Sequence, residues 1–141
     1  MRVLLIASLL TASSVMAADV ERERLLGTWE PQNTAVHEVW TLESDGSRLH
    51  IVRTEDGKTT LDLECVPNGS ECMAKDEGKK AKITMYFNGA VLVQFETRDG
   101  DVTRRKFEPE GDRMKVEEEP LTGSAKTHSA DFARRLRADA H

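Results

Sequence analysis

The sequence lacks most of the features that would assign a chemistry to it. Aromatic residues are few, with two Trp, one Tyr and four Phe in 141 residues. There is no G-x-S-x-G elbow to present a nucleophilic serine, and no phosphate loop or dinucleotide fingerprint. No Ser or Cys is spaced with a His and a carboxylate in a pattern typical of nucleophilic catalysis. We therefore predict that the protein is not an enzyme and uses no cofactor.

A surplus of basic residues is also missing. The 20 Lys and Arg are outnumbered by 25 Asp and Glu, which gives a formal net charge of −5 at pH 7. Nucleic-acid binding requires a basic face, and adhesion to an anionic membrane surface requires clusters of Lys and Arg. The charge balance therefore argues against both kinds of partner.

Long hydrophobic runs are absent. The apolar stretch at residues 3–10 is much shorter than the roughly 20 residues that a membrane-spanning helix needs. It follows Arg2 and precedes small residues at 15–17, which is the order found in a secretory signal peptide. We predict a cleaved signal peptide over 1–17, a periplasmic or secreted protein, and no membrane span after cleavage.

Glycine recurs at regular intervals in the rest of the chain. After residue 29 a glycine recurs every 9 to 12 residues, and five of these glycines follow Asp or Asn in dipeptides that favour tight hairpins. Short strands between such turns predict an all-β fold. We expect an antiparallel up-and-down meander of about 8–10 strands that forms a small barrel, closed or partly open. This domain is predicted over 18–134, with a short N-terminal helix, and 135–141 is predicted as a flexible or short helical tail.

The first predicted hairpin suggests a ligand-binding site. A loop centred on Asp45-Gly46 would place Trp40 opposite Ile51 on the inward face, and Glu38 opposite Arg53 beyond them. A charged pair at the end of an apolar face could orient the polar group of a ligand. The alternative is that the pair only marks the solvated rim of the barrel, since Glu and Arg are rarely buried.

The later loops set which residues join this face. A three-residue loop at 55–57 keeps the apolar residues on one side of the sheet, opposing Ile51 to Leu61. The loop at 88–90 leaves the register open, because three residues would align the apolar faces and two would leave both faces apolar. If 98–100 form a bulged loop, Arg105 becomes a further candidate site residue, opposite Val93.

Two charged runs are interpreted as surface. Residues 103–106 form a basic stripe, for which a solvated outer face is favoured over an acidic partner or anionic ligand. Residues 116–120 carry three successive Glu and are interpreted as the end of a strand in water.

The two cysteines flank another predicted turn. Any even loop centred on Asn68-Gly69 makes Cys65 and Cys72 directly opposed, which is within disulfide reach. A redox pair would need C-x-x-C, and a zinc site would need four ligands at a recognisable spacing, which the four histidines do not supply. We predict a disulfide, as an exported protein permits, and no metal site.

A short helical lead-in, then Gly27-x-Trp29, then a meander punctuated by Asp-Gly turns, resembles the lipocalin-like (calycin-type) β-barrels. In particular it resembles the small exported lipocalin-like domains of bacteria. The resemblance implies that Trp29 is structural and lies across the closed end of the barrel. A basic residue from the last strand, Arg134 or Arg135, would cover it. Because the chain is shorter than a full-size lipocalin, its cavity is expected to be filled or its barrel partly open.

These observations support two functions of different kinds. The first is an exported protein that binds a small, partly apolar or amphipathic ligand through Glu38, Trp40, Arg53 and Arg105. The second is a protein-binding module with a filled barrel, such as a periplasmic inhibitor or assembly factor whose partner is unknown. The longest predicted loop, 31–35, carries no apolar anchor for a partner, which weakens the second function.

Overall fold

The protein is described here by a computed structural model, which covers residues 20–136. The predicted signal peptide, 1–17, and the end of the predicted tail, 137–141, lie outside the described residues. Within them, no helix is long and apolar enough to cross a membrane.

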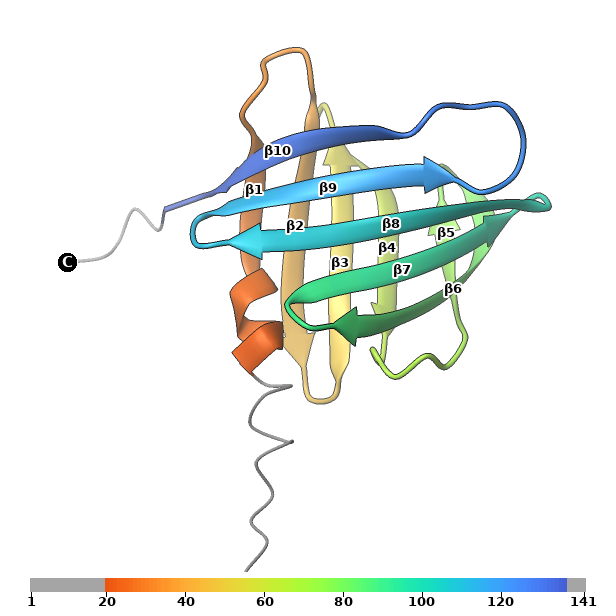
Figure 1. Cartoon of the computed structure of the whole chain (residues 1–141), viewed down its shortest axis with the longest axis horizontal. Coiled ribbons are helices and arrows are strands. Elements are labelled where there is room, and N and C mark those ends of the chain that lie inside the picture. Colours follow the sequence, from red (N-terminus) through yellow and green to blue (C-terminus); the bar gives the residue numbers. More distant parts are fainter. Residues whose placement is uncertain (1–19, 137–141) are drawn as a thin grey trace, which may run out of the picture.

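Ten antiparallel strands form a closed up-and-down barrel, because each strand pairs with the next and β1 also pairs with β10 (Figure 1). A short helix over 20–25 precedes the first strand. The all-β meander is confirmed, and the barrel is closed rather than partly open. The strands are β1 (Gly27–Pro31), β2 (Glu38–Asp45), β3 (Arg48–Glu55), β4 (Lys58–Cys65), β5 (Cys72–Asp76), β6 (Lys79–Asn88), β7 (Val91–Arg98), β8 (Asp101–Glu110), β9 (Arg113–Pro120) and β10 (His128–Arg134).

The connections between strands gather at two ends of the barrel. We call one end the mouth; it carries the turns at 56–57, 77–78 and 99–100 and the loops 32–37 and 121–127. We call the other end the floor; it carries the helix and the connections at 46–47, 66–71, 89–90 and 111–112. Both ends are visible in Figure 1, where β1–β4 stand nearly upright and β6–β10 lie across them.

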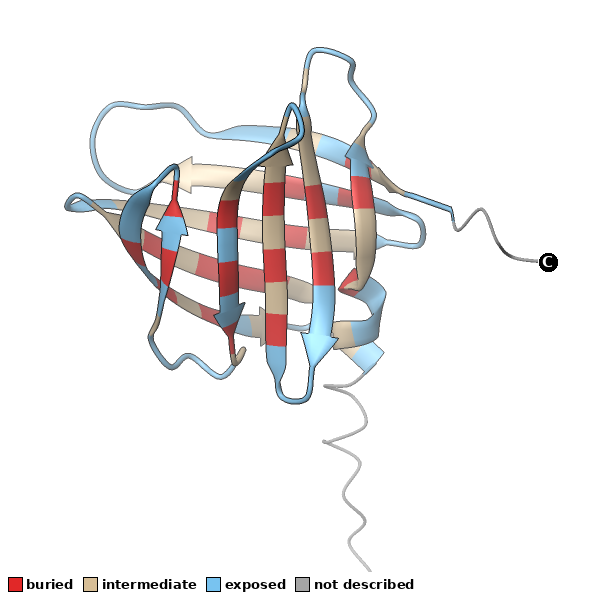
Figure 2. Cartoon of the chain, turned by 180° about the vertical axis from the view of Figure 1, so that it is seen from behind, coloured by how far each residue is buried: buried red, intermediate tan, exposed pale blue. Residues whose placement is uncertain are grey.

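The barrel interior is filled by side chains from both layers of strands. Buried and more exposed residues alternate along most strands (Figure 2), as the period of two in a half-buried strand requires, although Leu92, Val93 and Gln94 of β7 are all buried. Near the centre, the rings of Trp40 and Phe107 meet edge to face with their centroids 5.1 Å apart. Completely buried apolar side chains surround them: Trp29, Leu42, Leu49, Ile51, Leu61, Ile83, Met85, Leu92 and Phe132. Each contributes about 1.5–3 kcal/mol to folding through its burial.

The first hairpin shows that its predicted register is wrong. Its turn is Gly46-Ser47, so that Trp40 pairs with Arg53 rather than Ile51. Glu38 correspondingly pairs with Glu55 rather than with Arg53. The reason is that Gly46, at φ 59°, occupies the first turn position, where a hairpin turn of type II′ needs a positive φ. The loop centre therefore moves by one residue while the inward face stays the same.

The next hairpin also differs from its prediction. Its turn consists of Asp56-Gly57 only, and not of the three predicted residues. The ladder instead has one extra residue within the strands, a bulge next to Arg53 and Thr54. Ile51 is consequently opposite Leu63 and not Leu61. Because the bulge replaces the third loop residue, the apolar residues still share one face.

The seam between β4 and β5 is the shortest ladder in the barrel, with two registered pairs, Leu61 with Asp76 and Asp62 with Lys75. A disulfide joins Cys65 and Cys72 near the floor end of this seam, with Cα atoms 5.9 Å apart. The predicted disulfide is thus confirmed. It links two strands that share few backbone hydrogen bonds, and so it holds the barrel closed where the sheet is weakest.

Candidate functional site

A pocket of about 200 Å³ lies at the mouth, and charged side chains line it. The sequence-predicted residues Glu38, Arg53 and Arg105 all line this pocket. Trp40 lies beneath them, with its ring centroid 5.6 Å from Cζ of Arg53 and 5.5 Å from Cζ of Arg105. The structure therefore brings the four predicted ligand-binding residues together.

Arg53 is aimed into the pocket by the bulge in β4. Its Nε donates to the hydroxyl of Thr60 at 2.9 Å, and that hydroxyl donates back to the carbonyl of Arg53 at 3.3 Å. Its Nη2 donates to Oδ1 of Asp76 at 2.5 Å. Arg53 is 5% exposed and Asp76 is 2% exposed, so this ion pair is removed from bulk water. A bulge commonly re-aims a side chain in this way.

Arg105 is the most enclosed charge of the pocket. It pairs with Gln94 across the sheet, not with Val93, because the turn at Asp99-Gly100 has two residues. Its Nη1 donates to Oε1 of Gln94 at 3.2 Å, and its Nε donates to Oε1 of Glu118 at 3.0 Å. Burial alone would lower the pKa of Arg105, but the negative charges of Glu118 and Glu96 outweigh it and raise that pKa. The guanidinium therefore stays charged.

Two carboxyl groups that line the pocket, Asp76 and Glu96, have pKa values shifted in opposite directions. Burial, together with the hydrogen bond to Asp76, raises the pKa of Glu96 to about 7. Burial would raise the pKa of Asp76 as well, but the hydrogen bond from Glu96 and the charge of Arg53 outweigh it, so the pKa of Asp76 is lowered. Neighbouring carboxyls divide in this way because two adjacent negative charges repel.

Glu38 has no ion-pair partner among the described residues of the pocket, although the charge of Arg53 partly offsets the effects that raise its pKa. Burial and the repulsion of Glu118 raise its pKa above the usual value. Nε1 of Trp40 donates to Oε2 of Glu38 at 3.3 Å. Among residues 20–136, Glu38 makes no ion pair with a basic side chain.

Two buried polar atoms near Arg105 have unused hydrogen-bonding capacity. Oε1 of Glu96 accepts no hydrogen bond and lies 3.6 Å from Nη1 of Arg105. Nε2 of Gln94 donates none. Because a buried polar atom without a partner costs about 1–3 kcal/mol, such atoms indicate that a further polar group belongs at the site.

Sequence reasoning missed several residues of this pocket. With a two-residue turn at Gly89-Ala90, Gln94 and Glu96 point inward and Val93 points outward. The two-residue turn decides the register that the sequence left open at 88–90. The sequence did signal the difficulty, because apolar residues fall on both faces of the strand when this turn has two residues.

The two charged runs were interpreted wrongly where they face the pocket, at Thr103 and Arg105 in the first run and at Glu118 in the second. Glu118, placed in water by sequence reasoning, has a side chain only 17% exposed and lines the pocket. In 103–106, strand alternation turns Arg105 inward, whereas Arg104 faces out and pairs with Glu119.

The floor is built around Trp29, as the resemblance implied. This side chain is fully buried, and its Nε1 donates to the carbonyl of Leu25 at 2.9 Å. The structure places Arg134 over it, with Cζ 4.4 Å from the ring centroid. Arg134 also donates to the carbonyl of Leu26, whereas Arg135 pairs with Glu30 on the surface.

Gly27 leaves room for this stack. Its φ of 135° is unfavourable for any residue with a side chain, and a Cβ there would lie 3.2 Å from Nη1 of Arg134. The side chain of Arg134 can therefore lie close along the start of β1.

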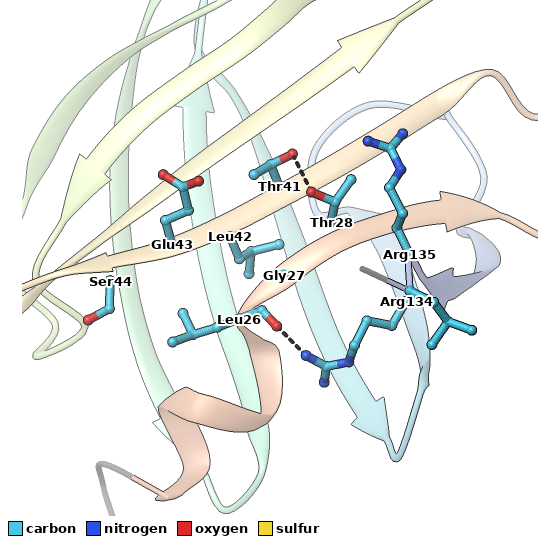
Figure 3. Close-up of a pocket in the computed structure, with 10 residues that line it drawn as sticks. Leu26, Gly27, Thr28, Thr41, Leu42, Glu43, Ser44, Arg134 and Arg135 are labelled. Carbon is cyan, nitrogen blue, oxygen red and sulfur yellow. Dashed lines mark hydrogen bonds between the residues drawn. The ribbon is translucent and has the colours of Figure 1, made fainter. Parts of the chain in front are cut away.

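A second hollow, a groove of about 780 Å³, lies beside the floor between β1, β2 and the end of β10 (Figure 3). Figure 3 shows two hydrogen bonds among its lining residues: the carbonyl of Leu26 accepts from Arg134, and the hydroxyls of Thr28 and Thr41 are 3.5 Å apart. None of its lining residues has a buried side-chain polar atom without a hydrogen-bond partner. The mouth pocket is therefore the stronger candidate site.

Metal binding finds no support in the described chain. Among residues 20–136, no three His, Cys, Asp or Glu side chains are grouped so that they could hold a metal ion.

The closed meander with a helix before its first strand is a lipocalin-like, calycin-type barrel, which confirms the resemblance at the level of the fold. No protein-family model matches the sequence, and no curated protein matches it. Solved structures match it well in shape.

Among these is fatty-acid-binding protein 1 of Echinococcus granulosus, with a TM-score of 0.69 and 12% identity, covering 81% of this chain and 99% of that chain. A secretory abundant heat soluble protein of Ramazzottius varieornatus has a TM-score of 0.68 and 11% identity, covering 79% and 96%. The Schistosoma mansoni fatty-acid-binding protein, in complex with arachidonic acid, has a TM-score of 0.67 and 18% identity, covering 82% and 99%. At these identities the likeness concerns the fold.

Proposed function

We propose that this protein is an exported binding protein that holds a small, partly apolar molecule at the mouth pocket. One observation carries the proposal. The buried polar or charged residues of the described chain all gather at this pocket or against it: Arg53, Asp76, Gln94, Glu96 and Arg105. Burying an ion costs several kcal/mol even when it is paired, and a packed barrel does not require it. Perturbed ionisable groups that cluster in a cleft are typical of functional sites.

The structural neighbours support the same kind of function. Two of those named above are fatty-acid-binding proteins. In this barrel Trp40 and Phe107 fill the centre below the pocket, which limits the room for a ligand. A volume of about 200 Å³ corresponds to roughly six or seven waters at ~30 Å³ each. The ligand proposed is accordingly small, with its polar group among the charges and its apolar part against the Trp40 side of the pocket.

Export is part of the proposal and rests on two supports. The first 17 residues have the order of a secretory signal peptide. The Cys65–Cys72 disulfide suits an oxidising compartment. Mass spectrometry of the mature N-terminus after expression with the native leader tests this part, with a first residue of Ala18 expected and an uncleaved chain contradicting it.

Native mass spectrometry of the mature, oxidised protein tests the binding function. We expect a discrete mass adduct on the folded protein that disappears on denaturation. Thr103, which lines the pocket, offers a way to block it without removing a charge. Thr103→Phe should abolish the adduct, whereas Thr97→Phe on the outer face of β7 should retain it. An adduct that survives Thr103→Phe would place the ligand elsewhere, and a bare mass in every variant would contradict the proposal.

A further inference from the structure

The charges of the mouth pocket do not balance. Six carboxyl side chains and three guanidinium groups line it. Each guanidinium already has a carboxylate beside it: Asp76 for Arg53, Glu77 for Arg98 and Glu118 for Arg105. An anionic ligand would therefore enter a pocket with excess negative charge, and would compete with carboxylates for the same donors.

The acceptors of the pocket, by contrast, are in surplus. Glu38 has no basic partner within 20–136, although it is partly buried and faces the repulsion of Glu118. Oε1 of Glu96, whose side chain is 5% exposed, lines the same pocket and accepts no hydrogen bond. Arg105 forms an ion pair with it at 3.6 Å but already donates its hydrogen bonds to Gln94 and Glu118. A donor with positive charge would satisfy both groups and reduce the repulsion between the carboxyls.

We propose that the mouth pocket selects a small organic cation, an ammonium group on a short apolar body, which donates hydrogen bonds to Glu38 and Glu96. The inference rests on the proposed function and names the class of its ligand. A metal ion is not favoured, because the carboxyls are not grouped for coordination within the described chain. The pocket volume of about 200 Å³ suits a body of about six carbons.

Three compounds of equal length separate charge from size: hexylamine, hexanol and hexanoate. Their binding to the mature, oxidised protein can be measured by titration calorimetry at pH 8 and low salt, where the amine is charged. We expect hexylamine to bind at least about tenfold more tightly than hexanol, because it gains charge-assisted hydrogen bonds. Hexanoate should bind more weakly than hexanol.

A pair of variants assigns the effect to the pocket. Glu38→Gln should weaken hexylamine binding by about tenfold, the effect of losing one charged acceptor. Glu117→Gln is the matched control, because it removes the same charge from the outer face of β9, one residue from the pocket's Glu118. It should change the affinity by less than about twofold.

The outcomes distinguish this inference from the proposed function. Binding of hexanoate or hexanol as tight as that of hexylamine, blocked by Thr103→Phe, would keep the mouth as a ligand site and overturn its selectivity for a cation. Equal loss of affinity in Glu38→Gln and Glu117→Gln would also overturn it, since the effect would then come from net charge. Failure of hexylamine to bind would overturn the inference outright. The proposed function would fail only if Thr103→Phe abolished neither the native adduct nor the binding of any of these compounds.

Discussion

Arg134 at the floor stacks on Trp29 and donates to the backbone carbonyl of Leu26, whereas Arg53 and Arg105 at the mouth flank Trp40 and meet carboxylates. Both tryptophans are fully buried, so the two ends use similar side chains. They differ in what the guanidinium groups meet. At the floor Arg134 donates to the carbonyls of Leu26 and Arg24 and pairs with one exposed carboxylate, Asp112, at 3.4 Å, so its single charge is balanced. At the mouth the guanidinium groups meet carboxyl groups that outnumber them, which leaves negative charge that a bound cation would neutralise.

The largest effect is expected from removing the enclosed charge at the mouth. Arg105→Gln should lower the free energy of unfolding by about 3–5 kcal/mol, because Glu118 and Glu96 would be left buried without their partner. Arg104→Gln, one residue away on the outer face, should cost less than about 1 kcal/mol, as exposed ion pairs do. Urea denaturation of both variants measures the difference. Equal losses would show that Arg105 is not distinguished by its burial.

Next in size is the disulfide near the floor. Cys65→Ser with Cys72→Ser should lower the free energy of unfolding by about 2.5 kcal/mol, the chain-entropy value for so short a loop. Hydrogen exchange should then rise first along β4 and β5, because their ladder has only two registered pairs. Uniform exchange across all strands would contradict the view that this seam is the weakest.

A pH effect should come from the mouth alone. Since the folded pKa of Glu96, about 7, exceeds the ordinary value of 4.5, the folded state binds more protons between these pH values. Stability should therefore fall by up to about 3 kcal/mol as pH rises from 4.5 to 7 and level off above it. The raised pKa of Glu38 acts in the same direction. Glu96→Gln should flatten the profile of melting temperature against pH, and an unchanged slope would contradict the raised pKa of Glu96.

The smallest effect concerns the floor. Arg134→Gln should cost about 1–2 kcal/mol, because it removes the stack on Trp29 and the bond to Leu26. Arg135→Gln removes only the surface pair with Glu30 and should cost less than about 0.5 kcal/mol. Thermal melts of the two variants compare them, and a larger loss for Arg135→Gln would reverse the assignment.

The two ends also differ in where their turns begin, and the loops predicted at 45–46, 55–57 and 98–100 all differ from those observed. Asp56-Gly57 and Asp99-Gly100 at the mouth have positive φ at both residues, as an Asp-Gly hairpin suggests. At the floor, Gly46 and Gly89 take the first turn position instead, after an Asp or Asn that stays in the strand. A dipeptide alone does not show which of its residues begins the turn. For that reason the meander could be predicted while several registers could not.

The candidate site was predictable where alternation alone placed a residue. Glu38, Trp40 and Arg53 lie two or more residues apart along inward faces, so a register shift by two residues kept them inside. Asp76 and Glu96 depend on turns whose length was undecided, and their meeting depends on strands distant in the sequence. Their opposite pKa shifts arise in the closed barrel and have no signature in either strand alone.

The most direct measurement of the difference between the two ends is a ¹⁵N–¹H spectrum of the two tryptophan indoles during addition of hexylamine. Nε1 of Trp40 donates to Glu38 at the mouth, and Nε1 of Trp29 donates to Leu25 at the floor. Because one spectrum reports both ends, we predict that the Trp40 resonance shifts with the amine while the Trp29 resonance stays in place. A shift confined to Trp29, or saturable binding that moves neither indole, would contradict a ligand site at the mouth above a structural floor.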